Sequence, residues 1–273
     1  MADLWTDLLD CLTLHPQDPT AGLTAVFEGR NQQLTYHRLF GGQLLAQFAQ
    51  AAALVCPQKT VKSLHALFPR PGRSDEPVRY EVQLHHEGGT FASLSIVARQ
   101  TPGVIATAAV SMHAGEDGPS HQTIASPGAV PGREAGIQLD LMPGETRSTD
   151  DLDAAPAGPP EYALWLRTPA VDPAFAAAVL AYATDLTLIG TALRPLDGVG
   201  QRDAGTAFTS AVTSHTLWFH RPFRTDTWLL LRQHSPLLAH GRSFGRGDVL
   251  EADGTLVASY AQEALLRFPA VKK

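Results

Sequence analysis

The chain carries one pattern twice, Phe68-Pro69-Arg70-Pro71-Gly72-Arg73-Ser74-Asp75 and Phe219-His220-Arg221-Pro222-Phe223-Arg224-Thr225-Asp226. Both copies read F-x-R-P-x-R-[S/T]-D. Two more matches follow in the same order and at nearly the same offset: Gly89-Thr90-Phe91 with Arg242-Ser243-Phe244, and Val104–Ala109 with Leu256–Ala261. An ordered series of matches at a near-constant offset indicates an internal duplication, so we expect one structural unit to be present twice.

Each half has the same order of predicted elements. An alanine-rich helical stretch comes first, His37–Val55 in one half and Asp172–Leu193 in the other. Strand-like runs separated by turns follow: Val78–His85, Ala92–Gln100, Val104–His113, Trp228–His234, Ser243–Glu251 and Thr255–Arg267. One helix against one antiparallel sheet, formed twice, is an α+β arrangement. We expect the two sheets to join edge to edge, because joining hides unpaired strand edges.

The two halves are separated by residues 115–160, a stretch rich in Gly, Pro, Ser and Asp. The predicted organisation is an N-terminal domain over residues 1–114, a linker over 115–160 and a C-terminal domain over 161–273. A length of 273 residues is comfortable for two domains.

Composition excludes several classes of protein. Hydrophobic residues make up 44% of the chain and charged residues 18%, which favours packed interiors over disorder. The net charge of -6 and the absence of a Lys/Arg block argue against a nucleic-acid partner. Two cysteines without ligand spacing predict neither a disulfide framework nor a metal site. The acidic start is unlike a signal peptide, and the apolar stretch Ala174–Ala183 is too short to span a bilayer, so a cytoplasmic protein is expected.

Two polar side chains stand where apolar ones are expected. Asp185 lies in an apolar helical stripe, so it is either a functional group or a solvated cap of a helix that ends near Thr184. Gln262 shares strand parity with the apolar set, and the first copy has Val110 at its equivalent position. This asymmetry nominates the second half as the active one, although a buried glutamine bound to backbone groups fits the same pattern.

Other polar groups give weaker signals. Gly41 and Gly42 begin a helix, where free backbone N–H groups can bind an oxyanion, but the sequence alone favours a helix-start or close-packing glycine pair. The chain contains no GxSxG elbow for a Ser-His-Asp triad, and we interpret His215 and His220 as structural. Hydroxyls are frequent before the second copy of the repeat: Thr209, Ser210, Thr213, Ser214 and Thr216.

These features resemble the type II acyl-CoA thioesterase family, whose members are double hotdogs. The likeness runs through nearly the whole chain in the segments Arg38–Gln43, Leu67–Gly72, Ala181–Leu186, Leu217–Phe223 and Leu256–Glu263. It implies two fused hotdog domains and the hydrolysis of a fatty or other acyl-CoA thioester to free acid and CoA. The acyl-CoA substrate is then the expected partner, with no cofactor, and a homodimer or larger assembly is the default expectation.

The resemblance also implies a site in which an aspartate, a Ser/Thr hydroxyl and a glutamine bind one water. Asp185 and Gln262 match the first and third groups. Counting back from His215 without a gap places Val212 at the hydroxyl position, whereas a two-residue bulge brings Ser210 there. We therefore take Ser210 as the third catalytic residue, with Thr213 and Ser214 as alternatives.

The remaining roles follow from the chemistry of a thioester. Asp185 would orient and deprotonate the water, and backbone N–H groups at Gly41 and Gly42 would bind the oxyanion. Arg221, Arg224 and Arg246 are the candidates to meet CoA phosphates.

Two other functions compete with hydrolysis. A double hotdog that binds an acyl-CoA or related acyl ligand without turnover is supported by Val212. A hydratase or dehydratase on the same fold would need a D-x-N-x-x-H context, which the sequence lacks.

Overall fold

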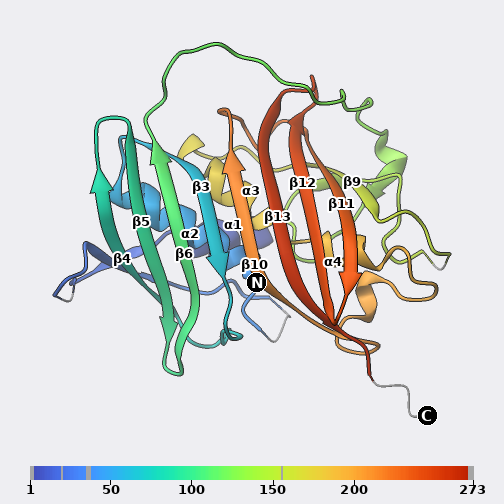
Figure 1. Cartoon of the computed structure of the whole chain (residues 1–273), viewed down its shortest axis with the longest axis horizontal. Coiled ribbons are helices and arrows are strands. Elements are labelled where there is room, and N and C mark those ends of the chain that lie inside the picture. Colours follow the sequence, from blue (N-terminus) through green and yellow to red (C-terminus); the bar gives the residue numbers. More distant parts are fainter. Residues whose placement is uncertain (1–2, 20, 35–37, 155, 270–273) are drawn as a thin grey trace.

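The computed structural model describes residues 3–19, 21–34, 38–154 and 156–269. Within them a single antiparallel sheet of 13 strands runs across the molecule, with the long helices on one of its faces (Figure 1). The first half contains α1 (Leu4–Leu12), β1 (His15–Gln17), β2 (Ala25–Gly29), α2 (Gly41–Val55), β3 (Thr60–Leu67), β4 (Val78–Glu87), β5 (Phe91–Gln100) and β6 (Gly103–His113).

The rest of the chain supplies the second half of the sheet. Its elements are η1 (Arg133–Ala135), β7 (Gly136–Ile137), β8 (Glu145–Arg147), β9 (Glu161–Arg167), η2 (Pro173–Phe175), α3 (Ala176–Thr184), α4 (Leu188–Leu193), η3 (Gln201–Asp203), β10 (Thr209–Phe219), β11 (Leu229–Ala239), β12 (Arg242–Glu251) and β13 (Leu256–Arg267).

The two halves meet at the middle of the sheet. The strand order is β1-β2-β4-β5-β6-β3-β10-β13-β12-β11-β9-β8-β7, so β3 of one half pairs with β10 of the other. In this pairing Leu64 lies opposite Leu217. The predicted edge-to-edge joining of two helix-on-sheet units is confirmed. The joint removes one strand edge from each half, which lowers the exposure of unpaired backbone groups.

The predicted strands correspond to β4, β5, β6, β11, β12 and β13, and β11 continues five residues beyond the expected end, to Ala239. Strand β9 was not predicted. Its apolar residues Leu164, Trp165 and Leu166 are consecutive, so it lacks the alternation by which a half-buried strand is recognised. The predicted linker also contributes two short strands, β8 and the edge strand β7, and crosses from β6 over the top of the view in Figure 1.

The helical predictions differ from the structure at their boundaries. Helix α2 begins at Gly41, and the expected start, His37, lies outside the described residues. The second predicted helix, Asp172–Leu193, is divided into η2, α3 and α4 by a break at residues 185–187. This segment is apolar and long enough to cross a membrane by composition, yet 83% of its most apolar window is buried inside the protein. It is a core layer, and α3 packs directly on α2.

The core lies between this helical layer and the sheet. Its largest fully buried side chains include Phe48 of α2, Tyr80 of β4, Tyr182 of α3 and Tyr260 of β13. Burying a large apolar side chain stabilises a fold by about 1.5–3 kcal/mol. The Tyr182 hydroxyl is bound by the side chain of Gln32 and the carbonyl of Leu141, which ties the second half to the first. Phe40, directly before α2, packs on the Tyr182 ring with the centroids 5.0 Å apart, so the end of α3 lies against the start of α2.

Candidate active site

Asp185 terminates helix α3 and is buried there. It is the residue directly after Thr184, and its side chain is only 2% exposed. The helix therefore ends where one sequence interpretation placed its end, but Asp185 is not a solvated cap. A backbone N–H at the start of α2, that of Gly42, donates a hydrogen bond to its carboxylate. A helix N-terminus favours a negative charge, so α2 offsets part of the cost of burying this carboxylate.

Gly41 and Gly42 allow the Asp185 carboxylate to lie close to the start of α2. A Cβ atom on Gly41 would lie 2.6 Å from Oδ2 of Asp185, closer than non-bonded atoms can pack. A Cβ atom on Gly42 would lie 2.6 Å from the carbonyl oxygen of Tyr182. The pair thus has the close-packing role, and in this structure the Gly42 N–H is engaged by Asp185. The N–H groups of the first helical turn have no carbonyl partner within a helix, and among the described residues no backbone carbonyl accepts from the Gly41 N–H.

Gln262 reaches the same carboxylate from the sheet. Its Nε2 donates to Oδ1 of Asp185 at 2.5 Å, and the residue is 3% exposed. The prediction that Gln262 faces the core is correct, and the NH₂ group of its amide is bound by side chains. Asp185 and Gln262 are 77 residues apart in sequence, and the fold brings them into direct contact.

His215 is a site residue that the sequence interpretation missed. It lies directly opposite Gln262 in the β10–β13 pairing, with its Nδ1 3.1 Å from Nε2 of Gln262 and 3.8 Å from Oδ1 of Asp185. Its ring stacks on Tyr260 with the centroids 6.0 Å apart. Burial lowers the pKa of His215 to about 3, so the imidazole is neutral.

The duplication contained the signal for His215. In the first half, β3 pairs with β6 so that Leu64 lies opposite Val110. The corresponding pair in the second half is His215 opposite Gln262. Both members of an apolar pair are therefore replaced by polar groups, although the sequence comparison used only the change from Val110 to Gln262.

The hydroxyl predictions do not agree with the strand register. Ser210 lies opposite Leu266, four residues along β13 from Gln262, or roughly 13 Å at about 3.3 Å per residue. The bulge in strand β10 falls at Thr213. Val212, opposite Ala264, is therefore the inner-face residue that comes before His215 on this strand. The hydroxyl of Thr213 donates to the carbonyl of Glu263.

Ser214 is excluded as a site residue by the same register. It lies opposite Glu263, the neighbour of Gln262, so it projects from the other face of the sheet. There it lines a groove with residues such as Leu67. Neither Ser210 nor Ser214 therefore completes a trio with Asp185 and Gln262.

The three predicted CoA-binding arginines also lie apart from the pair. Arg221 donates to the carbonyl of Leu256 and to the side chains of Gln122 and Ser120, so it fastens the linker to the second half. Arg224 is paired with the neighbouring Asp226 on the surface. None of these contacts involves Asp185.

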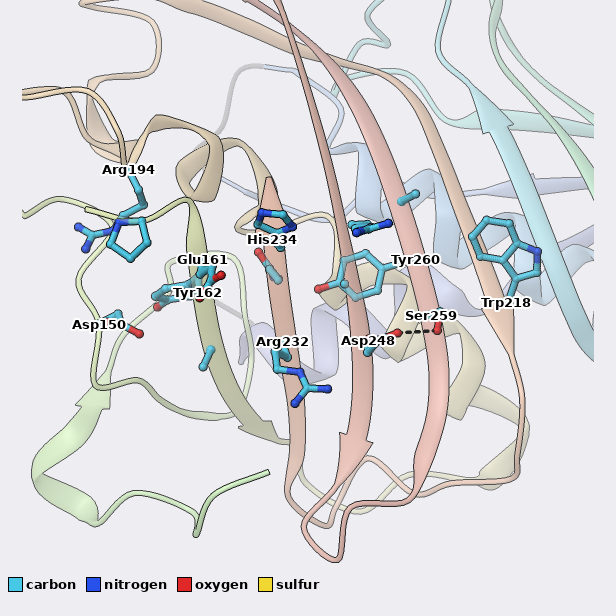
Figure 2. A pocket seen from close by; sticks show the side chains of 16 residues that line it. Asp150, Glu161, Tyr162, Arg194, Trp218, Arg232, His234, Asp248, Ser259 and Tyr260 are labelled. Carbon is cyan, nitrogen blue, oxygen red and sulfur yellow. Dashed lines mark hydrogen bonds between the residues drawn. The ribbon is translucent and has the colours of Figure 1, made fainter. Parts of the chain in front are cut away.

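Arg246 lies on the opposite face of the sheet. It is paired with Ala261, the residue before Gln262, and successive residues of a strand point to opposite faces. That outer face carries a groove of about 740 Å³, whose lining includes Arg246 and, as Figure 2 shows, Trp218, Arg232 and His234. The sheet itself separates this groove from the carboxylate.

Electrostatics suit Asp185 to proton transfer. Burial raises its pKa, hydrogen bonds from the Gly42 N–H and the Gln262 amide oppose the rise, and the resulting value is about 7. A general base works best when its pKa is near the operating pH. Within the described part of the chain, no three His, Cys, Asp or Glu side chains gather closely enough to hold a metal ion.

Two helix-on-sheet units joined through one sheet, with a buried Asp–Gln pair in the second unit, define a double hotdog protein. Comparison with family models assigns both units. Residues 31–113 match the acyl-CoA thioesterase N-terminal domain, and residues 116–266 match the acyl-CoA thioesterase C-terminal domain. The chain therefore belongs to the type II acyl-CoA thioesterase family.

Individual relatives cover nearly the whole chain. Acyl-CoA thioesterase 2 of Haemophilus influenzae is 31% identical over 98% of this chain and 99% of its own length. Human acyl-coenzyme A thioesterase 8 is 28% identical over 94% of this chain and 87% of its own. Among solved structures, acyl-CoA thioesterase II TesB2 of Mycobacterium marinum superposes with a TM-score of 0.78 at 28% identity, covering 96% of this chain and 99% of that one.

Proposed function

We propose that this protein hydrolyses acyl-CoA thioesters to free acid and CoA, with Asp185 as the general base in a site completed by Gln262. The observation that carries the proposal is the Asp185 carboxylate, which is buried, bound by the start of α2 and by the Gln262 amide, and has a pKa of about 7. Family membership supports the reaction class. The alternative of ligand binding without turnover rests on Val212, because neither Ser210 nor Ser214 supplies a hydroxyl beside Gln262, and the thioesterase relatives do not favour it.

The proposed reaction needs one water and no cofactor. Asp185 accepts a proton from the water while the water oxygen attacks the thioester carbonyl carbon. Free N–H groups at the start of α2, beginning with Gly41, stabilise the oxyanion. The carbon–sulfur bond then breaks, and protonated Asp185 returns its proton to the CoA sulfur. Because Asp185 and Gln262 are buried, each of these interactions is stronger than it would be in bulk water.

Turnover of a panel of acyl-CoA esters of different chain length tests this proposal. We expect Asp185→Asn to lower kcat by about 100-fold or more, because general-base catalysis contributes about 10²–10⁴-fold. Asp172→Asn is a matched control, since Asp172 caps η2 on the surface and asparagine caps a helix as well as aspartate does.

Two results would contradict the proposal. Wild-type turnover by a folded Asp185→Asn protein would remove Asp185 from the mechanism. Tight binding of acyl-CoA esters with no hydrolysis of any of them would instead establish the ligand-binding alternative.

A further inference from the structure

A chain of buried hydrogen bonds connects Asp185 to the backbone of α3. Gln262 Nε2 lies 2.5 Å from Asp185 Oδ1 and 3.1 Å from Nδ1 of His215. On the other side of the ring, Nε2 of His215 lies 3.1 Å from Oγ1 of Thr184, which in turn donates to the carbonyl of Ala181 at 2.9 Å. His215 and Thr184 are both fully buried, so water does not compete for these contacts.

The direction of each hydrogen bond can be assigned from its ends. A carbonyl only accepts, so the Thr184 hydroxyl proton is committed to Ala181. The Thr184 oxygen must then accept from His215, whose Nε2 therefore carries the ring proton. A neutral imidazole has one N–H, so Nδ1 of His215 is a bare acceptor facing Gln262.

The same reasoning fixes the orientation of the Gln262 amide. An ionised carboxylate only accepts, so the end of the amide that faces Asp185 must be the NH₂ group. One of its two protons goes to Asp185 and the other to His215. The carbonyl oxygen Oε1 of Gln262 then points away from both partners, and neither of them needs it.

We propose that His215, held by Thr184 as its Nε2–H tautomer, is a positioning residue that locks the Gln262 amide with its carbonyl oxygen free to hold the attacking water. Asp185 and Gln262 then each offer one acceptor oxygen to the two water protons, and a lone pair of the water oxygen is left to attack. This inference rests on the proposed function, and it explains how the site works with Val212 in place of a hydroxyl.

Substitutions at His215 test its positioning role, because asparagine and glutamine side chains place polar atoms at the positions of different ring nitrogens. Asparagine places an acceptor near the Nδ1 position, whereas glutamine reaches the Nε2 position. We expect His215→Gln to lower kcat by about 10- to 100-fold with little change in KM, a typical loss when the partner that orients a functional group is removed. His215→Asn should recover most of this loss. Equal kcat values for the two folded variants would overturn the inference.

A measurement on the unmodified protein covers the case in which both variants fail to fold. The ¹⁵N resonances of His215 should report the neutral Nε2–H tautomer throughout pH 5–9. A Nδ1–H tautomer or an imidazolium in that range would overturn the inference. This test can be separated from the test of the proposed function. Loss of turnover in Asp185→Asn with no effect of His215→Gln would contradict only the role of His215.

Discussion

At the scale of single residues, the proposed role of Asp185 as general base predicts how the activity depends on pH. Burial raises the pKa of this carboxyl to about 7, and only the ionised form can accept a proton from water. We therefore expect kcat/KM to rise with pH through a single transition near pH 7 and to level off above it, because kcat/KM reports groups of the free enzyme. A rate profile from pH 5 to 9 checks this expectation. A rate that is flat from pH 5 upward would show that the base titrates as an ordinary aspartate.

The glycine at position 41 offers a second test at this scale. Gly41→Ala would place a methyl group 2.6 Å from Asp185 Oδ2, so either the carboxylate or the start of α2 must move. We expect a loss of at least about 10-fold in kcat/KM, because small misplacements of reacting groups are costly, and a stability loss of about 1–3 kcal/mol from overpacking. Activity and urea unfolding measure the two effects. Gly89→Ala is the control, since a Cβ atom there meets nothing within 4 Å.

At the scale of elements, the paired strands β10 and β13 differ from β3 and β6 by two buried residues. Replacing His215 by Leu and Gln262 by Val would give the second half the apolar pair Leu64–Val110 of the first. Each single replacement leaves the other polar side chain buried without its hydrogen-bond partner, whereas the double replacement removes both polar side chains. We expect the double variant to be inactive and more stable than the sum of the singles by about 0.5–3 kcal/mol. A double-mutant cycle of unfolding free energies measures this coupling, and strict additivity would show that the two side chains do not interact.

The elements also differ in how well they were predicted. Long alternating strands such as β5 and β13 were placed within a residue or two of their ends, because alternation is a local property of the chain. The bulge at Thr213 could not be placed, since a bulge depends on the register of two strands and one strand alone does not specify it. The error over Ser210 arose from assuming a longer bulge than the one that the strand pairing contains.

At the scale of the whole molecule, the linker is part of the second half's surface. Arg221 of the repeated motif binds Ser120, Gln122 and the carbonyl of Leu256. We expect Arg221→Ala to speed proteolytic cleavage of the linker near these residues while leaving kcat unchanged, because the contacts lie away from Asp185. Limited proteolysis with mass mapping tests this. Arg224→Ala is the control, since within the described residues the Arg224 guanidinium pairs with Asp226 alone, and equal cleavage of the two variants would contradict the role of Arg221.

The sequence by itself determined the duplicated α+β architecture and the joining of two sheets, and it nominated Asp185 and Gln262 in the second half as the proposed site. These follow from repetition and from polar residues placed among apolar ones, and both can be read along a single chain. Only the tertiary structure decided that His215 contacts Gln262, that Gly41 and Gly42 admit Asp185 to the start of α2, and that Arg246 lies on the other face of the sheet. Each depends on which residues of separate elements are neighbours in space, and that is settled by strand register and helix packing across the whole fold.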